Sequence, residues 1–245
     1  MQKIHYVQWI KRFIFYLLGL SLVAFGINIA KVSDLGISPV SSIPFVLGAQ
    51  FDFLTNGQWT TVIYAAFVLV QLLLLLKDFK WYYLLQIAVA FVFGWLVDGT
   101  AILVHLVLST PEFYALKLVL ILVSMIFIAF GIFFYLEANI MSMPGEGVTV
   151  AISTRFKCTV PTAKLIFDIS ITAIAVMLSL CFFGELKIVR EGTLICMVGV
   201  GLIMKPIMKL LKKPVHDLIY GKPQKTETVE QAAQPVAQTT EENDE

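Results

Sequence analysis

The chain has 245 residues, of which 58% are hydrophobic and 14% are charged, and its mean hydropathy is +0.85. This composition is too apolar for a soluble domain and predicts an integral membrane protein in a lipid bilayer. The net charge of +1 hides basic residues near both ends and acidic residues near the C-terminus, so it indicates little about partners, and we expect no nucleic acid among them.

The apolar runs, taken in chain order, approach the roughly 20 residues that a helix needs to cross the hydrocarbon layer. The first run continues without a small-residue cleavage pattern, so we interpret it as an uncleaved span. We predict an all-α, polytopic membrane helical bundle of six transmembrane helices. The expected spans are residues 8–30, 58–76, 81–104, 115–138, 161–183 and 190–211.

The distribution of Lys and Arg predicts which loops face the cytoplasm. With the N-terminus inside, fourteen of these residues fall on the inner side and four on the outer side. An extra span at residues 38–51 would weaken this pattern, so we expect a short helix or re-entrant segment there. The sequence therefore predicts one transmembrane domain over residues 1–221 with both termini cytoplasmic, and a disordered acidic cytoplasmic tail over 222–245.

The two halves of the chain share a repeated pattern. Residues 24–27, AFGI, recur as residues 129–132, and a two-residue insertion later changes the offset from 105 to 107. Three further pairs keep the offset of 105, and two later pairs have the offset of 107: Gly19 and Ser124, Asp34 and Asn139, Pro39 and Pro144, then Lys80 and Lys187, Gly94 and Gly201.

Three crossings in each half place the second half in the membrane with the opposite orientation. We therefore expect two inverted three-helix repeats, over about residues 8–104 and 115–211. The segments DLGISP and ANIMSMPGEG interrupt the helices at related places. Because lipid cannot satisfy irregular backbone, such segments lie against protein or water, and in many secondary transporters they build the binding site.

Three motifs carry a resemblance to a known family: SDLGISP at 33–39, GWLVD at 94–98 and EGT at 191–193. With these motifs the chain resembles the YczE/YitT-like bacterial membrane proteins over about residues 10–215. The resemblance implies a multi-pass protein of the bacterial inner (plasma) membrane, but no activity, because the family's function is largely unassigned. The second half has MPGE at 143–146 in place of a second Ser-Pro, which argues against a fully symmetric site.

Polar residues beside the two interrupted segments are the first candidates for contacts with a solute. Asp34 is either a cap or interfacial charge, or a ligand contact paired with Asn139. The hydroxyls after it either start a helix or present an anion site at its N-terminus. These hydroxyls belong to Ser38, Ser41 and Ser42. Glu137 and Glu146 flank the second segment as gating or solvated charges, and we expect Glu146 to be the more exposed.

Charged residues within the spans are the next candidates. Asp98 lies inside the third span, where a carboxylate costs roughly 2.5–3.5 kcal/mol at the centre. It either faces a solute path or bonds to a nearby helix. Asp168 follows Lys164 by four residues, which favours an intrahelical ion pair over a proton or cation site. Gln71 and Gln86 are equally distant from the turn between their helices, so we expect them to hydrogen-bond to each other.

The sequence contains no pattern for catalysis or for a cofactor. Its cysteines and histidines lack metal-binding or redox spacing, and no P-loop, GxSxG or dinucleotide motif occurs. We expect no enzyme activity, cofactor or metal. The leading hypothesis is a transporter or permease that moves a small solute, with or without a coupling ion, by alternating access. The alternatives are a membrane scaffold that binds a protein partner and an intramembrane enzyme acting on a lipid.

Overall fold

The computed structural model describes residues 2–220, which form helices and no strands. The long helices are α1 (Gln2–Ser33), α3 (Asn56–Leu75), α4 (Leu85–Val107), α5 (Tyr114–Ala138), α7 (Val160–Phe183) and α8 (Glu191–Tyr220). The short elements are α2 (Pro39–Gln50), η1 (Leu76–Asp78), η2 (Trp81–Leu84) and α6 (Pro144–Phe156). Six segments among the described residues are long and apolar enough to cross a membrane, which confirms the number and places of the predicted spans.

The two short helices α2 and α6 begin in the same way. Each follows a residue with left-handed backbone at the end of a long helix, Asp34 with φ 54° and Asn139 with φ 49°. Each then starts with a proline, which needs no backbone hydrogen bond at the first helical position. The short helix expected at residues 38–51 is therefore confirmed, and a second one follows the other interrupted segment.

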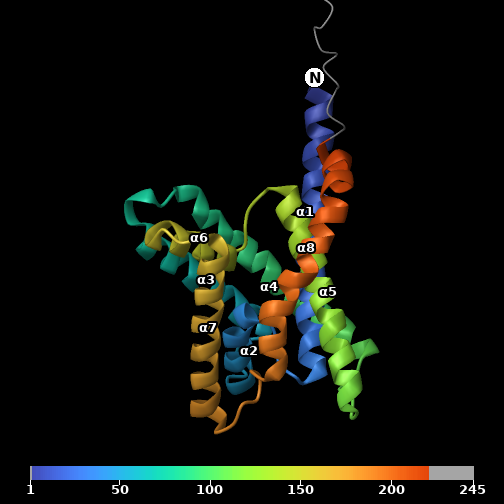
Figure 1. The fold of residues 1–245 in the computed structure, drawn as a ribbon, viewed down its shortest axis with the longest axis vertical. Coiled ribbons are helices and arrows are strands. Elements are labelled where there is room, and N and C mark those ends of the chain that lie inside the picture. Colours follow the sequence, from blue (N-terminus) through green and yellow to red (C-terminus); the bar gives the residue numbers. More distant parts are fainter. Residues whose placement is uncertain (1, 221–245) are drawn as a thin grey trace, which may run out of the picture.

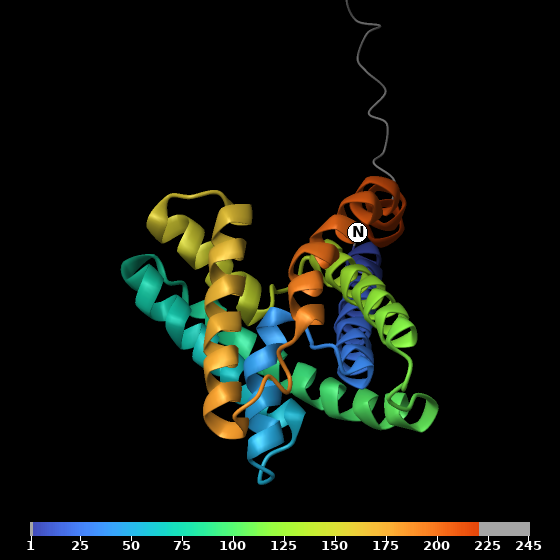
Figure 2. The same cartoon turned by 60° about the horizontal axis from the view of Figure 1, so that its bottom comes forward.

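Helices α1 and α5 form the tightest helix pair and run antiparallel (Figures 1 and 2). A Cβ on Gly19 would collide with the backbone of Gly131, and one on Gly26 would collide with that of Ser124. Small residues let helix backbones approach closely where lipid gives no hydrophobic drive for association. Gly19, Gly26, Ser124 and Gly131 are the small residues that allow this close approach.

The helices divide into two groups by their contacts. We call α2, α3, α6 and α7 the first lobe, in which each helix packs on two others, and α1, α4, α5 and α8 the second lobe. The hairpin of α3 and α4 joins the lobes with extensive packing, whereas α7 and α8 hardly touch. Figure 1 shows α7 and α8 standing apart on the same face of the molecule.

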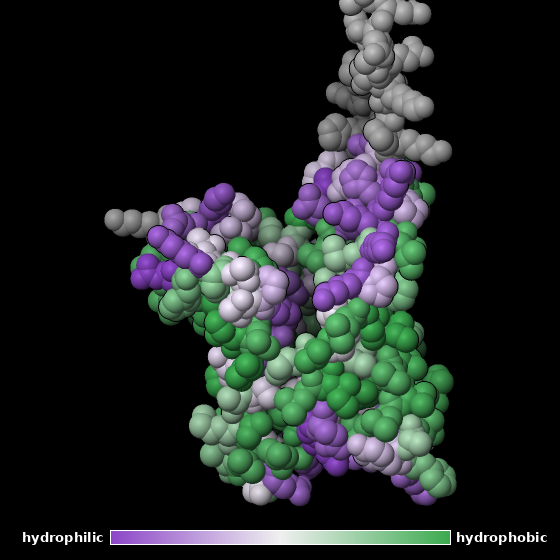
Figure 3. Space-filling model, viewed as in Figure 1, coloured by the Kyte–Doolittle hydropathy of each residue, from purple (hydrophilic) through white to green (hydrophobic). Residues whose placement is uncertain are grey.

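The two ends of the spans differ in charge. We call the end that holds the start of α1 and the end of α8 the basic end, and the opposite end the Asp34 end. Figure 3 shows hydrophilic side chains over the basic end, a broad apolar zone below it and a smaller hydrophilic group at the lower edge. Many large apolar side chains of the spans are exposed on the surface, as is expected of helices that face lipid.

Helix α8 extends beyond the predicted span, to Tyr220, because its Lys-rich final turns continue the helix past the apolar run. The tail expected over residues 222–245 lies outside the described residues.

Candidate functional site

A cavity of about 280 Å³ lies between the two lobes, and we call it the central cavity. Of the eight α-helices within residues 2–220, seven line it, and α4 does not. Its polar lining comes from Ser38, Ser41, Tyr64, Tyr135, Glu146, Lys164 and Asp168. Figure 3 shows the surface hollowed between the first lobe and α8 toward the basic end. A concave, mostly apolar site with a few convergent polar groups is the usual form of a small-molecule site.

The starts of α2 and α6 meet at this cavity. Gly145 lies against Val40, since a Cβ on Gly145 would be 3.0 Å from Cγ1 of Val40. Neither first turn receives a side-chain cap, and the Ser38 hydroxyl instead donates to Oγ of Ser41 at 3.2 Å. Because the N-terminus of a helix carries partial positive charge, two such termini set the potential of the cavity wall.

An ion pair on α7 forms one charged part of the lining. Nζ of Lys164 lies 2.8 and 2.7 Å from the two carboxylate oxygens of Asp168. Asp168 is buried, with 3% of its surface exposed, whereas Lys164 is exposed. The intrahelical pair predicted from the spacing is confirmed, and its charges largely cancel within the cavity.

Glu146 forms the other charged part of the lining. The hydroxyl of Tyr135 donates to its Oε1 at 2.7 Å, while its Oε2 is buried and has no hydrogen-bond partner. Glu146 lies in α6, outside the six spans, and burial raises the pKa of its carboxyl above the ordinary value, against the opposing effects of Tyr135 and Lys164. The expectation that Glu146 is the more exposed of the two glutamates is not supported by this buried oxygen.

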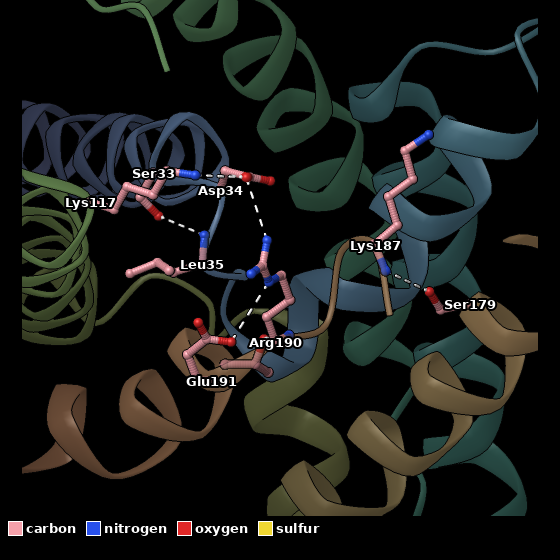
Figure 4. Close-up of polar contacts among 9 residues, drawn as sticks. Ser33, Asp34, Leu35, Lys117, Ser179, Lys187, Arg190 and Glu191 are labelled. Carbon is pink, nitrogen blue, oxygen red and sulfur yellow. Dashed lines mark hydrogen bonds and ion pairs between the residues drawn. The ribbon is translucent and has the colours of Figure 1, made fainter. Parts of the chain in front are cut away.

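Ion pairs join helices at the Asp34 end, and Figure 4 shows them around Asp34. One carboxylate oxygen of Asp34 lies 2.9 Å from Nζ of Lys117 and 3.4 Å from a guanidinium nitrogen of Arg190. Arg190 also pairs with Glu191 at 3.6 Å, and the next amide, of Gly192, donates to the Leu35 carbonyl at 2.8 Å. Asp34 is therefore not the cap of α2, because Ser38 occupies that position; it binds α5 and the start of α8 together.

A related arrangement occurs at the basic end. Arg12 donates to the carbonyls of Ala138, at 2.9 Å, and of Asn139. Arg12 and Lys117 are 105 residues apart, as are Asp34 and Asn139. In each case a basic residue in the first half of one long helix, α1 or α5, binds the residue with left-handed backbone that follows the other of these two helices.

A second cavity, of about 410 Å³, lies between α3, α4 and the second interrupted segment. Asn139 lines it together with Gln71 and Gln86, whose side chains hydrogen-bond at 2.8 Å as predicted. Gln71 also donates to the Pro144 carbonyl at 3.2 Å. The glutamine pair therefore ties the start of α6 to the α3–α4 hairpin.

Asp98 does not line either cavity. Its carboxylate accepts hydrogen bonds from the amide of Gly57, at 2.8 Å, and from the Thr55 hydroxyl at the start of α3. A carboxylate at a helix N-terminus satisfies otherwise unpaired amides. Asp98 thus bonds to a nearby helix, α3, which is the second of the two alternatives that the sequence left open.

Of the residues that the sequence proposes for a site, the central cavity brings together Ser38, Ser41, Glu146 and Asp168. Ser42 is buried outside it, with its hydroxyl on the Pro39 carbonyl. Glu137 is half-buried on α5 and lines neither cavity.

Sequence reasoning missed Tyr64 and Tyr135, which resemble ordinary span aromatics, and it undervalued Glu146. The repeat contains a signal for Glu146, because the offset of 105 places it on Ser41.

The three cysteines, Cys158, Cys181 and Cys196, form no disulfide. Within residues 2–220 no group of three or more His, Cys, Asp or Glu side chains is arranged to hold a metal ion.

Comparison with known proteins gives a family and no assigned activity. No curated protein matches the chain, and no solved structure matches it. Residues 10–209 match a family described as "Family of unknown function (DUF6198)". Since this match covers most of the chain, the protein belongs to that family.

Proposed function

We propose that the protein is a transporter that binds a small solute in the central cavity and exposes it to the two sides of the membrane in turn. In this proposal, residues 8–104 and 115–211 form two inverted repeats, and the resemblance to YczE/YitT-like bacterial proteins is part of the same interpretation. Inverted repeats of this kind build binding sites where interrupted helices meet near the middle of the bilayer.

The observation that carries the proposal is the meeting of α2 and α6 at the cavity. Val40 and Gly145 are 105 residues apart in the sequence and lie in contact, which is expected of residues on either side of a two-fold axis. The antiparallel packing of α1 on α5 supports the same axis, because Gly19 meets Gly131 while Gly26 meets Ser124. Under the offset of 105 each of these contacts becomes the other.

The difference between the two ends supports alternating access. The Asp34 end is closed by the ion pairs of Asp34, whereas the cavity reaches Lys164 and Met204 between the separated helices α7 and α8. A transporter passes through such one-sided states as its lobes rock about a fixed site. We assign the arrangement to the state that is open toward the basic end.

Cys196 offers a direct test, because it lines the cavity close to the start of α8 and is buried. With Cys158→Ser and Cys181→Ser it becomes the only thiol in the chain. A membrane-impermeant maleimide is applied to right-side-out and to inside-out vesicles, with the same chain carrying Cys196→Ser as the control for background labelling.

Alternating access predicts that Cys196 is labelled from both faces, faster from the face that carries the basic end. Labelling from one face alone, at every temperature at which the protein stays folded, would contradict the proposal. That result would favour the alternative of a membrane protein that serves a partner without moving a solute.

A further inference from the structure

One carboxylate oxygen in the central cavity, Oε2 of Glu146, is buried without a hydrogen-bond donor. This oxygen indicates the class of solute. We propose that the cavity takes a small organic cation with an apolar body, whose ammonium group binds Oε2 of Glu146 in exchange for a proton. This inference rests on the proposed function and assigns the substrate class and the coupling of the same cavity.

The charges that face the cavity leave one position open for a ligand. Lys164 already binds both carboxylate oxygens of Asp168, so neither residue needs a further charged partner. Glu146 has one donor, Tyr135, for its two oxygens, and its Oε2 is buried without a partner. A buried carboxylate oxygen without a donor is costly, so an ammonium or a proton is the complement that this position favours.

The remaining wall favours an organic body over a metal ion. Besides Tyr64 and Tyr135, it consists largely of aliphatic and methionine side chains, among them Val23, Ile27, Ile128, Ile132, Met197 and Met204. Hard metal cations need several oxygen ligands or retained water, and this lining supplies few oxygens. Aromatic faces attract organic ammonium groups instead, and methionine adapts to irregular apolar shapes.

The same geometry disfavours an anionic solute. The positive end of α6 already has the Glu146 carboxylate in its first turn, and the cavity's one cationic side chain is paired with Asp168. A bound carboxylate would lie beside two acidic side chains, and like charges at this range repel strongly where water is scarce.

Exchange with a proton follows from the position of Glu146. In the state open to the basic end, the carboxyl gives its proton to water, and the ammonium then binds the carboxylate. The titratable groups that face Glu146 are Tyr16 of α1, Tyr64 of α3, Tyr135 of α5, Lys164 and Asp168 of α7, and Cys196 of α8. Among these groups, α7 supplies the one ion pair, between Lys164 and Asp168, and its two charges offset each other.

The test compares three ligands that share one aromatic body. Phenethylamine, 2-phenylethanol and 3-phenylpropionate differ mainly in carrying an ammonium, a hydroxyl or a carboxylate, and a cavity of about 280 Å³ suits molecules of this small size. Binding to the purified full chain is measured by competition against radiolabelled phenethylamine between pH 6 and 9. We expect phenethylamine to bind at least tenfold more tightly than the other two ligands.

The affinity for phenethylamine should rise with pH as Glu146 loses its proton. Glu146→Gln should lower the affinity at least tenfold and remove the pH dependence, while Glu185→Gln, the same change at an exposed loop position, should alter neither. Tyr135→Phe should keep binding and move the midpoint of the pH dependence upward, because the lost hydrogen bond stabilises the charged carboxylate. This second variant tests the proposal even if Glu146→Gln fails to fold.

Asp168→Asn provides a further check on the charge argument. It leaves Lys164 unpaired in the cavity, so it should weaken phenethylamine binding, and Lys164→Gln added to it should restore much of the affinity.

Equal or tighter binding of 2-phenylethanol or 3-phenylpropionate, binding unaffected by Glu146→Gln, or no binding of any of the three ligands would overturn the inference. Those results would leave the proposed function standing if Cys196 is still labelled from both faces. Phenethylamine binding with Cys196 labelled from one face alone would support the site and overturn transport.

Discussion

The pairs α3–α4 and α7–α8, which correspond to each other under the proposed repeat, pack in opposite ways. Helices α3 and α4 pack along their length, and Gly57 and Gly94 touch through their backbones, whereas α7 and α8 stand apart with the central cavity between them. Under the proposed repeat, Gly94 corresponds to Gly201, which lines that cavity. Under the proposed function, this difference between the two hairpins is a conformational state that the two halves exchange.

The contact between α1 and α5 should stay the same when the two hairpins exchange their packing. A substitution at this contact should therefore destabilise both conformational states. We expect Gly131→Ala to lower the free energy of unfolding by about 1–3 kcal/mol, because the new methyl group would collide with the backbone of Gly19 and Val23. Thermal unfolding in detergent measures the effect.

Gly99→Ala is the matched control, since a Cβ there meets no other atom within 4 Å. It should raise stability by about 0.5–1 kcal/mol through helix propensity alone. Equal stability of the two variants would show that the α1–α5 contact is not the tight axis described above.

The hydrogen bond between Gln71 and Gln86 should stabilise the packed α3–α4 hairpin, which has no counterpart between α7 and α8. Gln71→Leu should cost about 1–3 kcal/mol, because it leaves the buried Oε1 of Gln86 and the Pro144 carbonyl without a donor. The double change of Gln71→Leu and Gln86→Leu should cost less than the sum of the two single changes. Additive costs in thermal unfolding would mean that the two amides do not bond to each other in the protein.

Asp34 should affect the position of the conformational equilibrium more than stability. Two partly exposed ion pairs are together worth about 1 kcal/mol, so Asp34→Asn should shift the population by about fivefold toward opening at the Asp34 end. The rate at which maleimide labels Cys196 from that face measures the shift. An unchanged rate would mean that the ion pairs do not hold this end closed.

Much of the fold could be predicted because it follows from local patterns. The spans depend on length and hydropathy, the pair of Lys164 and Asp168 on helical spacing, and the pair of Gln71 and Gln86 on equal distance from one turn. Each of these depends on residues that are close in the chain or related by a simple hairpin.

The partners of Asp34 and Glu146 could not be predicted in this way. Asp34 binds residues of α5 and of the turn before α8, and the donor to Glu146 is on a different helix. A glutamate between two glycines, two residues after a proline, also has the local sequence of a solvated turn, so nothing nearby indicates burial. Only the repeat relates these positions, because it aligns Ser41 with Glu146 and Arg12 with Lys117.

The exchange of the two hairpins is tested most directly by distances between spin labels in lipid bilayers. In a chain with the three native cysteines replaced by serine, one label pair uses Leu165→Cys on α7 and Lys205→Cys on α8, and the other uses Val62→Cys on α3 and Ile102→Cys on α4, all at exposed positions. We expect two populations for each pair, with the α7–α8 distance shortening in the state in which the α3–α4 distance lengthens, and a shift between them when Asp34→Asn is added. One narrow distance for both pairs, unchanged by Asp34→Asn, would contradict the account.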